Sequence, residues 1–403
     1  MVINKIIIIL RKKSNYKNNF YCKIIILIII YLFLIIIYFL TIKLFKTRNN
    51  FSRTQILTYA SHYLKMCLSG KLINNKKIIA FELPKEIKIS IIVPIYNSYK
   101  TIKAAIRSIQ NQKMKDIEII LINDHSKDNS TKIVKEMKEE DKRIKLLNNN
   151  KNMGILYSRC RGVLEAKGKY ILTLDQDDMF FNEDLFDIVY EEAEKGNYDI
   201  ISFIEVKDRN YHFNVSTMVD GFCTKHPDNL IIKQPELSFF PFFRKDRYYA
   251  NDIPIWGKLF ETKVYKNAIK LLGNKRYSVY NIINEDQIML YAICIIAQSY
   301  KFIREYGLFH LVNNPSASYS ASKDHNMKMR LFFNEVIFDL SKNEFKKYAA
   351  IFAISISKYW LVKISNKNKI YLIKIINKII NSKYINEEYK KKLIKKYKIL
   401  RII

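Results

Sequence analysis

The chain has 403 residues, enough for one large domain with appendages, and its formal net charge is +31 at pH 7. Such a charge usually indicates a nucleic-acid or anionic membrane partner, but here lysine is over-used together with isoleucine, asparagine and tyrosine throughout the chain. No RNA-binding motif, Cys/His zinc spacing or heptad array accompanies the charge, so we expect no nucleic-acid partner. The 5 cysteines are widely spread without CxxC spacing, which argues against a disulfide framework and leaves the redox compartment open.

The first element is an uncharged run of 19 residues, 24–42, nearly all Ile, Leu, Phe or Tyr. As an α-helix it would extend roughly 28 Å, about the thickness of the hydrocarbon core of a bilayer. We therefore predict a single transmembrane helix after a basic tail, residues 1–23. A cleaved signal peptide fits less well, since no small-residue cleavage site follows, and a buried core helix would need a polar face. Six cationic residues before the run and four after it favour a cytoplasmic N-terminus, as in type II proteins of the Golgi or ER, over a cytosol-facing orientation.

Residues 43–86 have no strong period and carry polar patches, so we predict a stem or linker. Beyond it, short apolar runs alternate with amphipathic ones. These patterns predict helices that include 102–109 and 155–166 between strands at 87–93, 117–122, 143–147 and 170–174, the first strand ending at Pro94. Repeated β-α-β units with short polar turns imply a parallel, doubly wound sheet whose ligand-binding loops share one edge.

The strand at 170–174 is the most informative, because it leads directly into Asp175-Gln176-Asp177-Asp178. Alternate residues of a strand face the same side, so Asp175 and Asp177 can present two carboxylates to one point at the carboxyl edge of the sheet. Like charges this close repel unless a cation lies between them, and hard oxygen ligands favour Mg²⁺ or Mn²⁺. Considered alone, the same acids could form a solvated loop.

Four segments follow in the order Val93-Pro94-Ile95-Tyr96-Asn97, Asn123-Asp124-His125-Ser126-Lys127-Asp128-Asn129-Ser130, Asn152-Met153-Gly154 with Ser158-Arg159, and Leu174-Asp175-Gln176-Asp177-Asp178. They resemble the VPxYN, [DN]DGSxDxS, NxGxxxAR and LDxDD motifs of the family 2 glycosyltransferases, which have the GT-A fold. The resemblance covers about residues 88–320. His125 replaces the usual Gly, which a turn with positive φ tolerates, and Cys160 stands where Asn often follows the Arg. We expect no catalytic role for Cys160.

The resemblance implies a nucleotide-sugar donor, typically a UDP-sugar. Pro94 and Tyr96 would line the nucleotide, with the Tyr96 ring stacked on the base, and Asp124 would accept a hydrogen bond from the base. Arg159 would pair with the diphosphate, and Asp175 would bind the donor beside it. The alternative for Tyr96 is a strand residue packed in the core without a ligand. The alternative for Arg159 is a cation on the surface of a helix.

The resemblance also implies a metal and a general base. Asp177 would be the direct ligand of Mn²⁺ or Mg²⁺, with Asp175 beside it and His310 as a candidate third ligand, unless His310 is structural. The segment Asn284-Glu285-Asp286-Gln287 resembles the family's ED motif, so Asp286 is the expected base and Glu285 the second choice. Alternatively, Glu285 and Asp286 only stabilise the N-terminus of a helix through its dipole and have no catalytic role.

The acceptor side is expected in the second half of the domain. Trp256-Gly257-Lys258-Leu259-Phe260 resembles the family's WxKLF segment, which places Trp256 and Lys258 near the acceptor, although Trp256 could equally be a core residue. The aromatic segment 239–244 could form a lid, and 313–318 resembles a loop that closes over the nucleotide. Residues 321–403 form a basic helical region that could lie along an anionic membrane or cap the domain.

The order of the elements predicts an α/β protein with a Rossmann-like, doubly wound, mostly parallel sheet. The resemblance implies a GT-A fold over residues 87–320, with a nucleotide-sugar half, 87–204, and an acceptor half, 205–320. The resemblance implies an inverting, metal-assisted transfer of a hexosyl or N-acetylhexosaminyl group to a hydroxyl of a glycan, lipid-linked or protein acceptor, and the apolar run at 24–42 would place it at a membrane. A catalytically silent relative that binds nucleotide-sugar or glycan is the alternative. A sugar nucleotidyltransferase is disfavoured, because Pro94-Ile95-Tyr96-Asn97 is not a Gly-rich phosphate loop.

Overall fold

The computed structural model describes residues 82–209, 219–220, 227–234, 236–238, 254–278 and 285–312, with residue 58 and short helical pieces between 332 and 391. These residues belong to the larger of two compact units, Leu57–Ile403. The expected transmembrane run at 24–42 lies outside the described residues, as do most of the stem and the segments 239–244 and 313–318. Within the described part, no helix combines the length and the apolar character needed to cross a bilayer.

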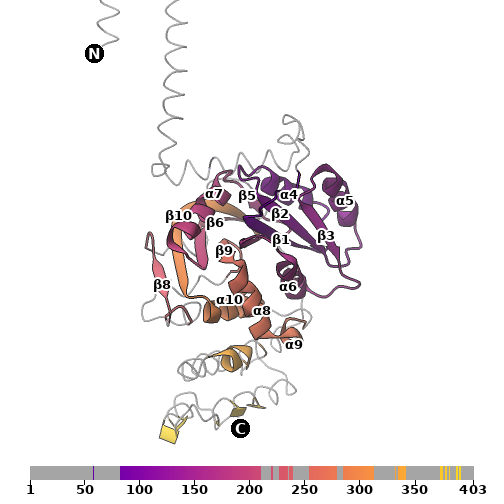
Figure 1. Ribbon diagram of the computed structural model, residues 1–403. Helices are drawn as coiled ribbons and strands as arrows, with labels where there is room; N and C mark the ends of the chain where they lie inside the picture. The colour runs from indigo at the N-terminus through magenta and orange to yellow at the C-terminus, as the bar shows by residue number, and fades with distance from the viewer. Residues whose placement is uncertain are drawn as a thin grey trace, which may run out of the picture. The chain divides into compact units, whose positions relative to one another are not determined.

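A ten-stranded sheet organises the unit, in the order β3-β2-β1-β4-β9-β6-β10-β5, with β7 beside β6 and β8 beside β10 (Figure 1). Its first four strands are mutually parallel, as the β-α-β pattern predicts. They are β1 (Ile89–Ile95), β2 (Ile117–Asn123), β3 (Ile144–Asn148) and β4 (Tyr170–Thr173).

The other half of the sheet is mixed, so the prediction of a mostly parallel sheet is wrong there. β9 (Lys258–Glu261) lies antiparallel between β4 and β6 (Ile200–Arg209), whereas β10 (Ser299–Val312) is parallel to β6. Three short strands, β5 (Met179–Phe180), β7 (Val219–Asp220) and β8 (Ile231–Lys233), pair antiparallel with these. Strands of two to four residues are too short to show a period in the sequence.

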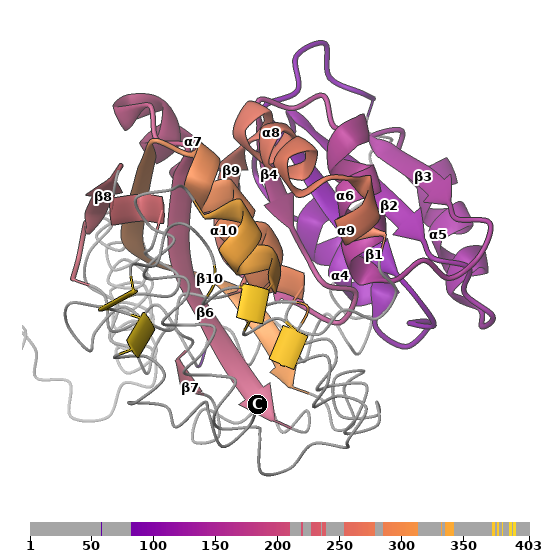
Figure 2. The same cartoon turned by 90° about the horizontal axis from the view of Figure 1, so that it is seen from below.

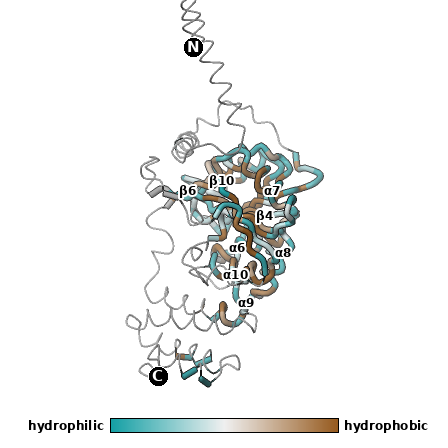
Figure 3. The backbone as a smooth tube through the Cα atoms, turned by 90° about the vertical axis from the view of Figure 1, so that its left-hand side faces the viewer, coloured by the Kyte–Doolittle hydropathy of each residue, from teal (hydrophilic) through white to brown (hydrophobic). Residues whose placement is uncertain are grey.

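Helices cover both faces of the sheet (Figures 1 and 2). Ile91 and Val93 of β1 pack in the core with α4 (Ile102–Gln110), α5 (Ser130–Glu140) and α7 (Leu185–Gly196). Ile92 faces the other way and packs with α6 (Ile155–Glu165), α8 (Thr262–Leu272) and α10 (Glu285–Ile296), next to the short α9 (Asn274–Tyr277). This alternation places the apolar residues of each strand between the layers (Figure 3).

Pro94 lies inside β1 and does not end it, which corrects the predicted boundary. The Ile92 carbonyl faces β4 and accepts a hydrogen bond from the Leu174 N–H. Because backbone groups alternate along a strand, the Pro94 nitrogen also faces the β4 side. β4 ends at Thr173, so the missing N–H of Pro94 interrupts no ladder bond. The strand order reverses between β1 and β4, which is where open α/β sheets bind ligands.

Candidate active site

The carboxyl edge of the parallel strands brings the predicted donor residues together. Tyr96 follows β1, Asp124 follows β2 and Asp175 follows β4. Because β1 lies between β2 and β4, the loops that begin with these residues are neighbours. Hydrogen bonds between the loops then fix their relative positions.

Asp124 holds the loop before α6. Its buried carboxylate accepts hydrogen bonds from the backbone N–H groups of Met153 (2.8 Å) and Gly154 (2.8 Å) and from Asn149 Nδ2 (2.7 Å). Gly154 has a φ of 89°, which favours glycine at this turn. A carboxylate can accept about four hydrogen bonds, so these three are compatible with a further bond to a nucleotide base, which stays a prediction.

The turn at Tyr96 and Asn97 is held by the neighbouring β2 loop. Asn97 has a φ of 50°, its N–H donates to Ser126 Oγ (3.1 Å), and its side-chain oxygen accepts from the Lys127 N–H (2.8 Å). Tyr96 is 42% exposed as a residue, so it is not packed into the core. An aromatic ring presented in this way is suited to stacking on a flat base.

The two departures from the family pattern have clear structural consequences. His125 has a φ of 64°, which meets the condition under which His is tolerated in place of Gly. Cys160 is fully buried, and burial raises the pKa of its thiol to about 12. A thiol that stays protonated is a poor nucleophile, in line with the expectation that Cys160 is not catalytic.

Arg159 is fully buried on α6, so the alternative of a surface cation is wrong. Its Nη1 donates to Asp286 (2.8 Å) and its Nη2 donates to Asp175 (3.0 Å). Burial by itself would lower the pKa of the guanidinium, but the charges of Asp286 and Asp175 outweigh it and raise that pKa. Close packing of the helix supports this placement, since a Cβ on Gly162 would come within 2.6 Å of Ile122. One planar cation thus joins a predicted donor carboxylate to the predicted base.

Asp286 and Glu285 lie in the first turn of α10, and the pKa of each carboxyl is raised. Burial raises the pKa of Asp286 to about 6, although Arg159 opposes the shift. Burial and the charge of Asp286 raise the pKa of Glu285 to about 8. Arg159 contacts Asp286 and favours its ionised form, so Asp286 is the acid of this pair that is better placed to accept a proton.

The acidic loop after β4 has the electrostatics of a cation site. Burial, followed by repulsion from Asp178 and Asp175, raises the pKa of Asp177 to about 7. Within the part of the chain that is described, no group of three or more His, Cys, Asp or Glu side chains is arranged to hold a metal. Mg²⁺ commonly binds through one or two carboxylates and the phosphates of the substrate, so Asp177 with Asp175 fits that type of site.

His310, on β10, is held by Asp178 and Trp256. Its Nδ1 lies 3.0 Å from both carboxylate oxygens of Asp178, and its ring stacks on the Trp256 indole with centroids 4.9 Å apart. Burial would lower the pKa of His310, but the charge and hydrogen bond of Asp178 raise it to about 9. Asp178 also accepts from the Leu311 N–H (3.1 Å). Since Nδ1 is engaged, a role of His310 as a metal ligand stays a prediction and would use Nε2.

The predicted acceptor residues are not freely displayed. The Trp256 indole N–H donates to Glu205, and one ring face is covered by His310, which favours the core alternative. Lys258 is buried in β9, where its ammonium donates to the Pro254 carbonyl (2.8 Å). Acceptor binding by either residue stays a prediction, as does nucleotide binding by the buried Pro94.

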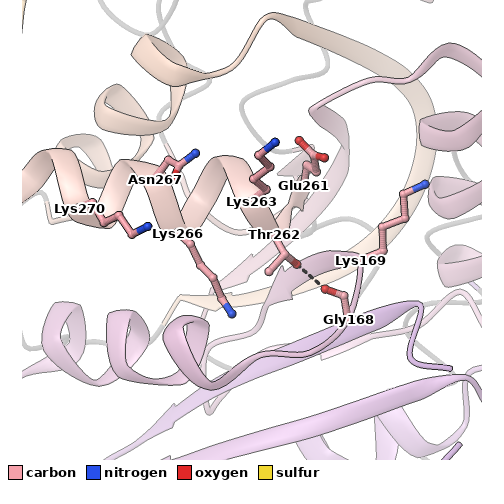
Figure 4. Close-up of a pocket in the computed structure, with 8 residues that line it drawn as sticks. All are labelled: Gly168, Lys169, Glu261, Thr262, Lys263, Lys266, Asn267 and Lys270. Atoms are coloured by element: carbon pink, nitrogen blue, oxygen red, sulfur yellow. Dashed lines mark hydrogen bonds between the residues drawn. The ribbon is translucent and has the colours of Figure 1, made fainter. Parts of the chain in front are cut away.

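A pocket of about 420 Å³ lies at the opposite edge of the sheet, before β4 (Figure 4). Four lysines, Lys169, Lys263, Lys266 and Lys270, line it. Lys169 pairs with Glu194, Lys266 donates to the Ala166 carbonyl, and the four ammonium groups point to different sides of the pocket. The lysines therefore do not converge on one anion.

Sequence reasoning missed three residues that shape the site: Asn149, Gln176 and Glu205. Gln176 occupies the variable position of the LDxDD motif, so the motif itself gives it no role. Glu205 could have been found, because it is a lone acid in the apolar run of β6. Asn149 follows β3 among several asparagines and has no distinguishing signal.

Known proteins match this chain in sequence and in structure. The family model for Glycosyl transferase family 2 matches residues 90–255. Residues 90–255 thus have the sequence of the family 2 glycosyltransferases. The chain is 28% identical over 313 residues to a cholesterol galactosyltransferase of Borreliella burgdorferi, an alignment that covers 76% of this chain and 81% of the relative.

One further relative agrees in sequence, and one solved structure agrees in fold. A GalNAc(5)-diNAcBac-PP-undecaprenol beta-1,3-glucosyltransferase of Campylobacter jejuni is 28% identical, with 50% of this chain and 67% of the relative covered. The fold is similar to that of S. aureus TarS 1-349 in complex with UDP-GlcNAc, at 17% identity and a TM-score of 0.54, with 75% of this chain and 83% of TarS 1-349 covered. The chain is a glycosyltransferase, and its family supports a nucleotide-sugar donor.

Proposed function

We propose that this glycosyltransferase moves a sugar from a UDP-sugar to a hydroxyl of a lipid or lipid-linked acceptor, with inversion and with Mn²⁺ or Mg²⁺ as cofactor. The observation that carries the proposal is the Arg159 bridge, in which one buried guanidinium contacts Asp175 and Asp286. The Arg159 guanidinium thereby fixes Asp175, a carboxylate of the proposed metal loop, close to Asp286, the proposed proton acceptor.

Donor binding uses the loops at the carboxyl edge. Tyr96 offers an exposed ring to the base, and Asp124 fixes the loop before α6. Asp177, with Asp175, would hold the metal, which supplies charge neutralisation for the diphosphate as it leaves. The raised pKa of Asp177 supports this role, because a nearby cation would relieve the repulsion from Asp178 and Asp175.

Asp286 acts as the base in this proposal. The acceptor oxygen forms a bond to the anomeric carbon while the bond from that carbon to the phosphate oxygen breaks. The hydroxyl proton passes to Asp286, and the nucleotide diphosphate leaves with the electron pair, so the anomeric configuration inverts. Arg159 keeps Asp286 oriented and stabilises its ionised form.

The choice of substrates follows the relatives. TarS was solved with UDP-GlcNAc, which supports a UDP-sugar. The names of two relatives state a cholesterol and an undecaprenol-linked acceptor, which supports a lipid or lipid-linked acceptor here. We also propose that residues 24–42 anchor the enzyme in a membrane, because the run is uncharged and long enough to span one. The charge bias favours a cytoplasmic N-terminus, and protease protection in sealed vesicles tests that orientation.

A panel of nucleotide-sugars assayed for hydrolysis by the full-length chain with Mn²⁺ tests the proposal. We expect turnover of at least one UDP-sugar, with water in place of the acceptor, and loss of turnover with EDTA. Metal-independent turnover would contradict the metal role. Binding of a donor without turnover, with or without a lipid acceptor, would favour the catalytically silent alternative.

A further inference from the structure

β1 and β4 separate just before the site, which leaves backbone groups of β1 without a neighbouring strand. The last register pair of these strands is Ile92 with Thr173, and the last bond between them runs from the Leu174 N–H to the Ile92 carbonyl. Backbone groups of alternate strand residues face the same side. Tyr96, the first residue after β1, continues this alternation, so its N–H and carbonyl face the side that β4 has left.

The side chain of Gln176 bonds to both of these backbone groups. The Tyr96 N–H donates to Gln176 Oε1 (2.6 Å), and Gln176 Nε2 donates to the Tyr96 carbonyl (3.1 Å). A primary amide offers one donor and one acceptor side by side, as a strand backbone does. Gln176 therefore continues the ladder between β1 and β4 after the two strands have diverged.

The position of Gln176 gives this pair of bonds a consequence. Gln176 lies between Asp175 and Asp177, the residues proposed to hold the metal, while Tyr96 carries the ring proposed to stack on the base. The Tyr96 turn is already fixed on its other side to Ser126 and Lys127. The Gln176 side chain thus links the turn proposed to bind the base directly to the loop proposed to bind the metal.

Resting on the proposed function, we propose that Gln176 is a positioning residue that couples binding of the nucleotide base to binding of the metal and diphosphate. A ligand that reaches both loops benefits from their fixed spacing. A ligand that contacts only the Tyr96 turn does not. Loss of the two bonds will therefore weaken metal-dependent binding of a nucleoside diphosphate selectively.

The test compares Gln176→Met, which keeps the side-chain length and removes both hydrogen bonds, with the wild-type full-length chain. Calorimetry measures the Kd of UDP with Mn²⁺, the Kd of UDP with EDTA, and the Kd of uridine. We expect the factor by which Mn²⁺ strengthens UDP binding to fall about tenfold in Gln176→Met, with uridine binding unchanged within about twofold.

Gln112→Met is the matched control. The Gln112 amide also forms two backbone bonds, donating to the Asn182 carbonyl (2.8 Å) and accepting from the Phe186 N–H (3.3 Å), but between other elements. We expect this variant to have a lower Tm and an unchanged Mn²⁺ effect. If Gln176 has only a structural role, Gln176→Met will also show a lower Tm and an unchanged Mn²⁺ effect. That result would overturn the inference.

The outcomes separate the two proposals. If the wild type binds UDP in a Mn²⁺-dependent manner and Gln176→Met keeps the full Mn²⁺ effect, Gln176 does not couple the loops and the proposed function stands. If the wild type shows no Mn²⁺-dependent binding of UDP, the proposed function fails, and the coupling that rests on it fails as well.

Discussion

The two ends of β4 carry clusters of opposite charge, and only one of them has the properties of a site. At the carboxyl end, Asp175, Asp177 and Asp178 lie within four residues, and burial and mutual repulsion raise the pKa of Asp177 to about 7. At the amino end, four lysines surround a pocket, but Lys263 and Lys270 are exposed and their ammonium groups point apart (Figure 4). Solvent screens such charges at little cost.

The comparison shows that a count of like charges does not predict a site. What distinguishes the acidic end is that the fold holds the three carboxylates close together and buries them partly or wholly. Asp175 is paired with Arg159 and Asp178 with His310, and a bound cation would stabilise the ionised form of Asp177. The basic end instead reflects the lysine-rich composition of the whole chain. The predictions below test this difference by changing one end at a time.

The largest effect is expected for Asp177→Asn at the acidic end. Removal of the carboxylate should weaken metal binding and reduce sugar transfer on the order of 10⁴-fold, because charge neutralisation of the leaving diphosphate is lost. Initial rates with a UDP-sugar and saturating Mn²⁺ measure it. Activity within tenfold of wild type would show that the acidic loop is only a solvated turn.

The next largest effect is expected for Asp286→Asn. Loss of the proton acceptor should lower kcat on the order of 10³-fold, while Asn can still accept a hydrogen bond from Arg159. Glu285→Gln is the matched control, and it should stay within about threefold of wild type at pH 7, because the raised pKa already keeps Glu285 protonated. Equal losses in both variants, at matched Tm, would remove the distinction between the two acids.

A pH profile should show a smaller and graded effect. The pKa of Asp286 is raised to about 6, and the active form is the carboxylate, so kcat/KM should fall as the pH falls through about 6 and level off above it. Below that value the decrease should approach about tenfold per pH unit. Saturating Mn²⁺ keeps Asp177 ionised during the measurement. A profile that is flat between pH 5 and pH 7 would argue against Asp286 as the base.

The smallest effect is expected at the basic end. The double variant Lys263→Ala/Lys270→Ala removes two exposed cations from the pocket and should leave kcat, KM and Tm close to wild type, with rates within about twofold. Titration with pyrophosphate provides the matching binding assay. A clear loss of pyrophosphate binding in this variant would show that the lysines do form an anion site.

Much of the donor half was predictable because its physical signals are local. Short, continuous apolar runs and polar turns define β1 to β4, and the loops that follow them carry Tyr96, Asp124 and Asp175 in recognisable motifs. The boundary at Pro94 failed because the effect of proline depends on which neighbouring strand its nitrogen faces.

The rest depended on contacts between residues far apart in the chain. Arg159 meets Asp286 across 127 positions, and His310 meets Asp178 across 132, so no local pattern encodes either pair. Trp256 and Lys258 were expected at the acceptor, but the fold engages them with Glu205, His310 and a backbone carbonyl. Gln176 escaped notice because its partners are backbone groups, which carry no sequence signal.

The central claim is that the acidic end of β4 binds a divalent cation together with the nucleotide diphosphate. Titration of Mn²⁺ into the full-length chain with UDP, followed by electron paramagnetic resonance of the free ion, tests it most directly. We predict one bound Mn²⁺ per wild-type chain and none in Asp177→Asn at the same concentrations. Equal Mn²⁺ binding by the two proteins would contradict the claim.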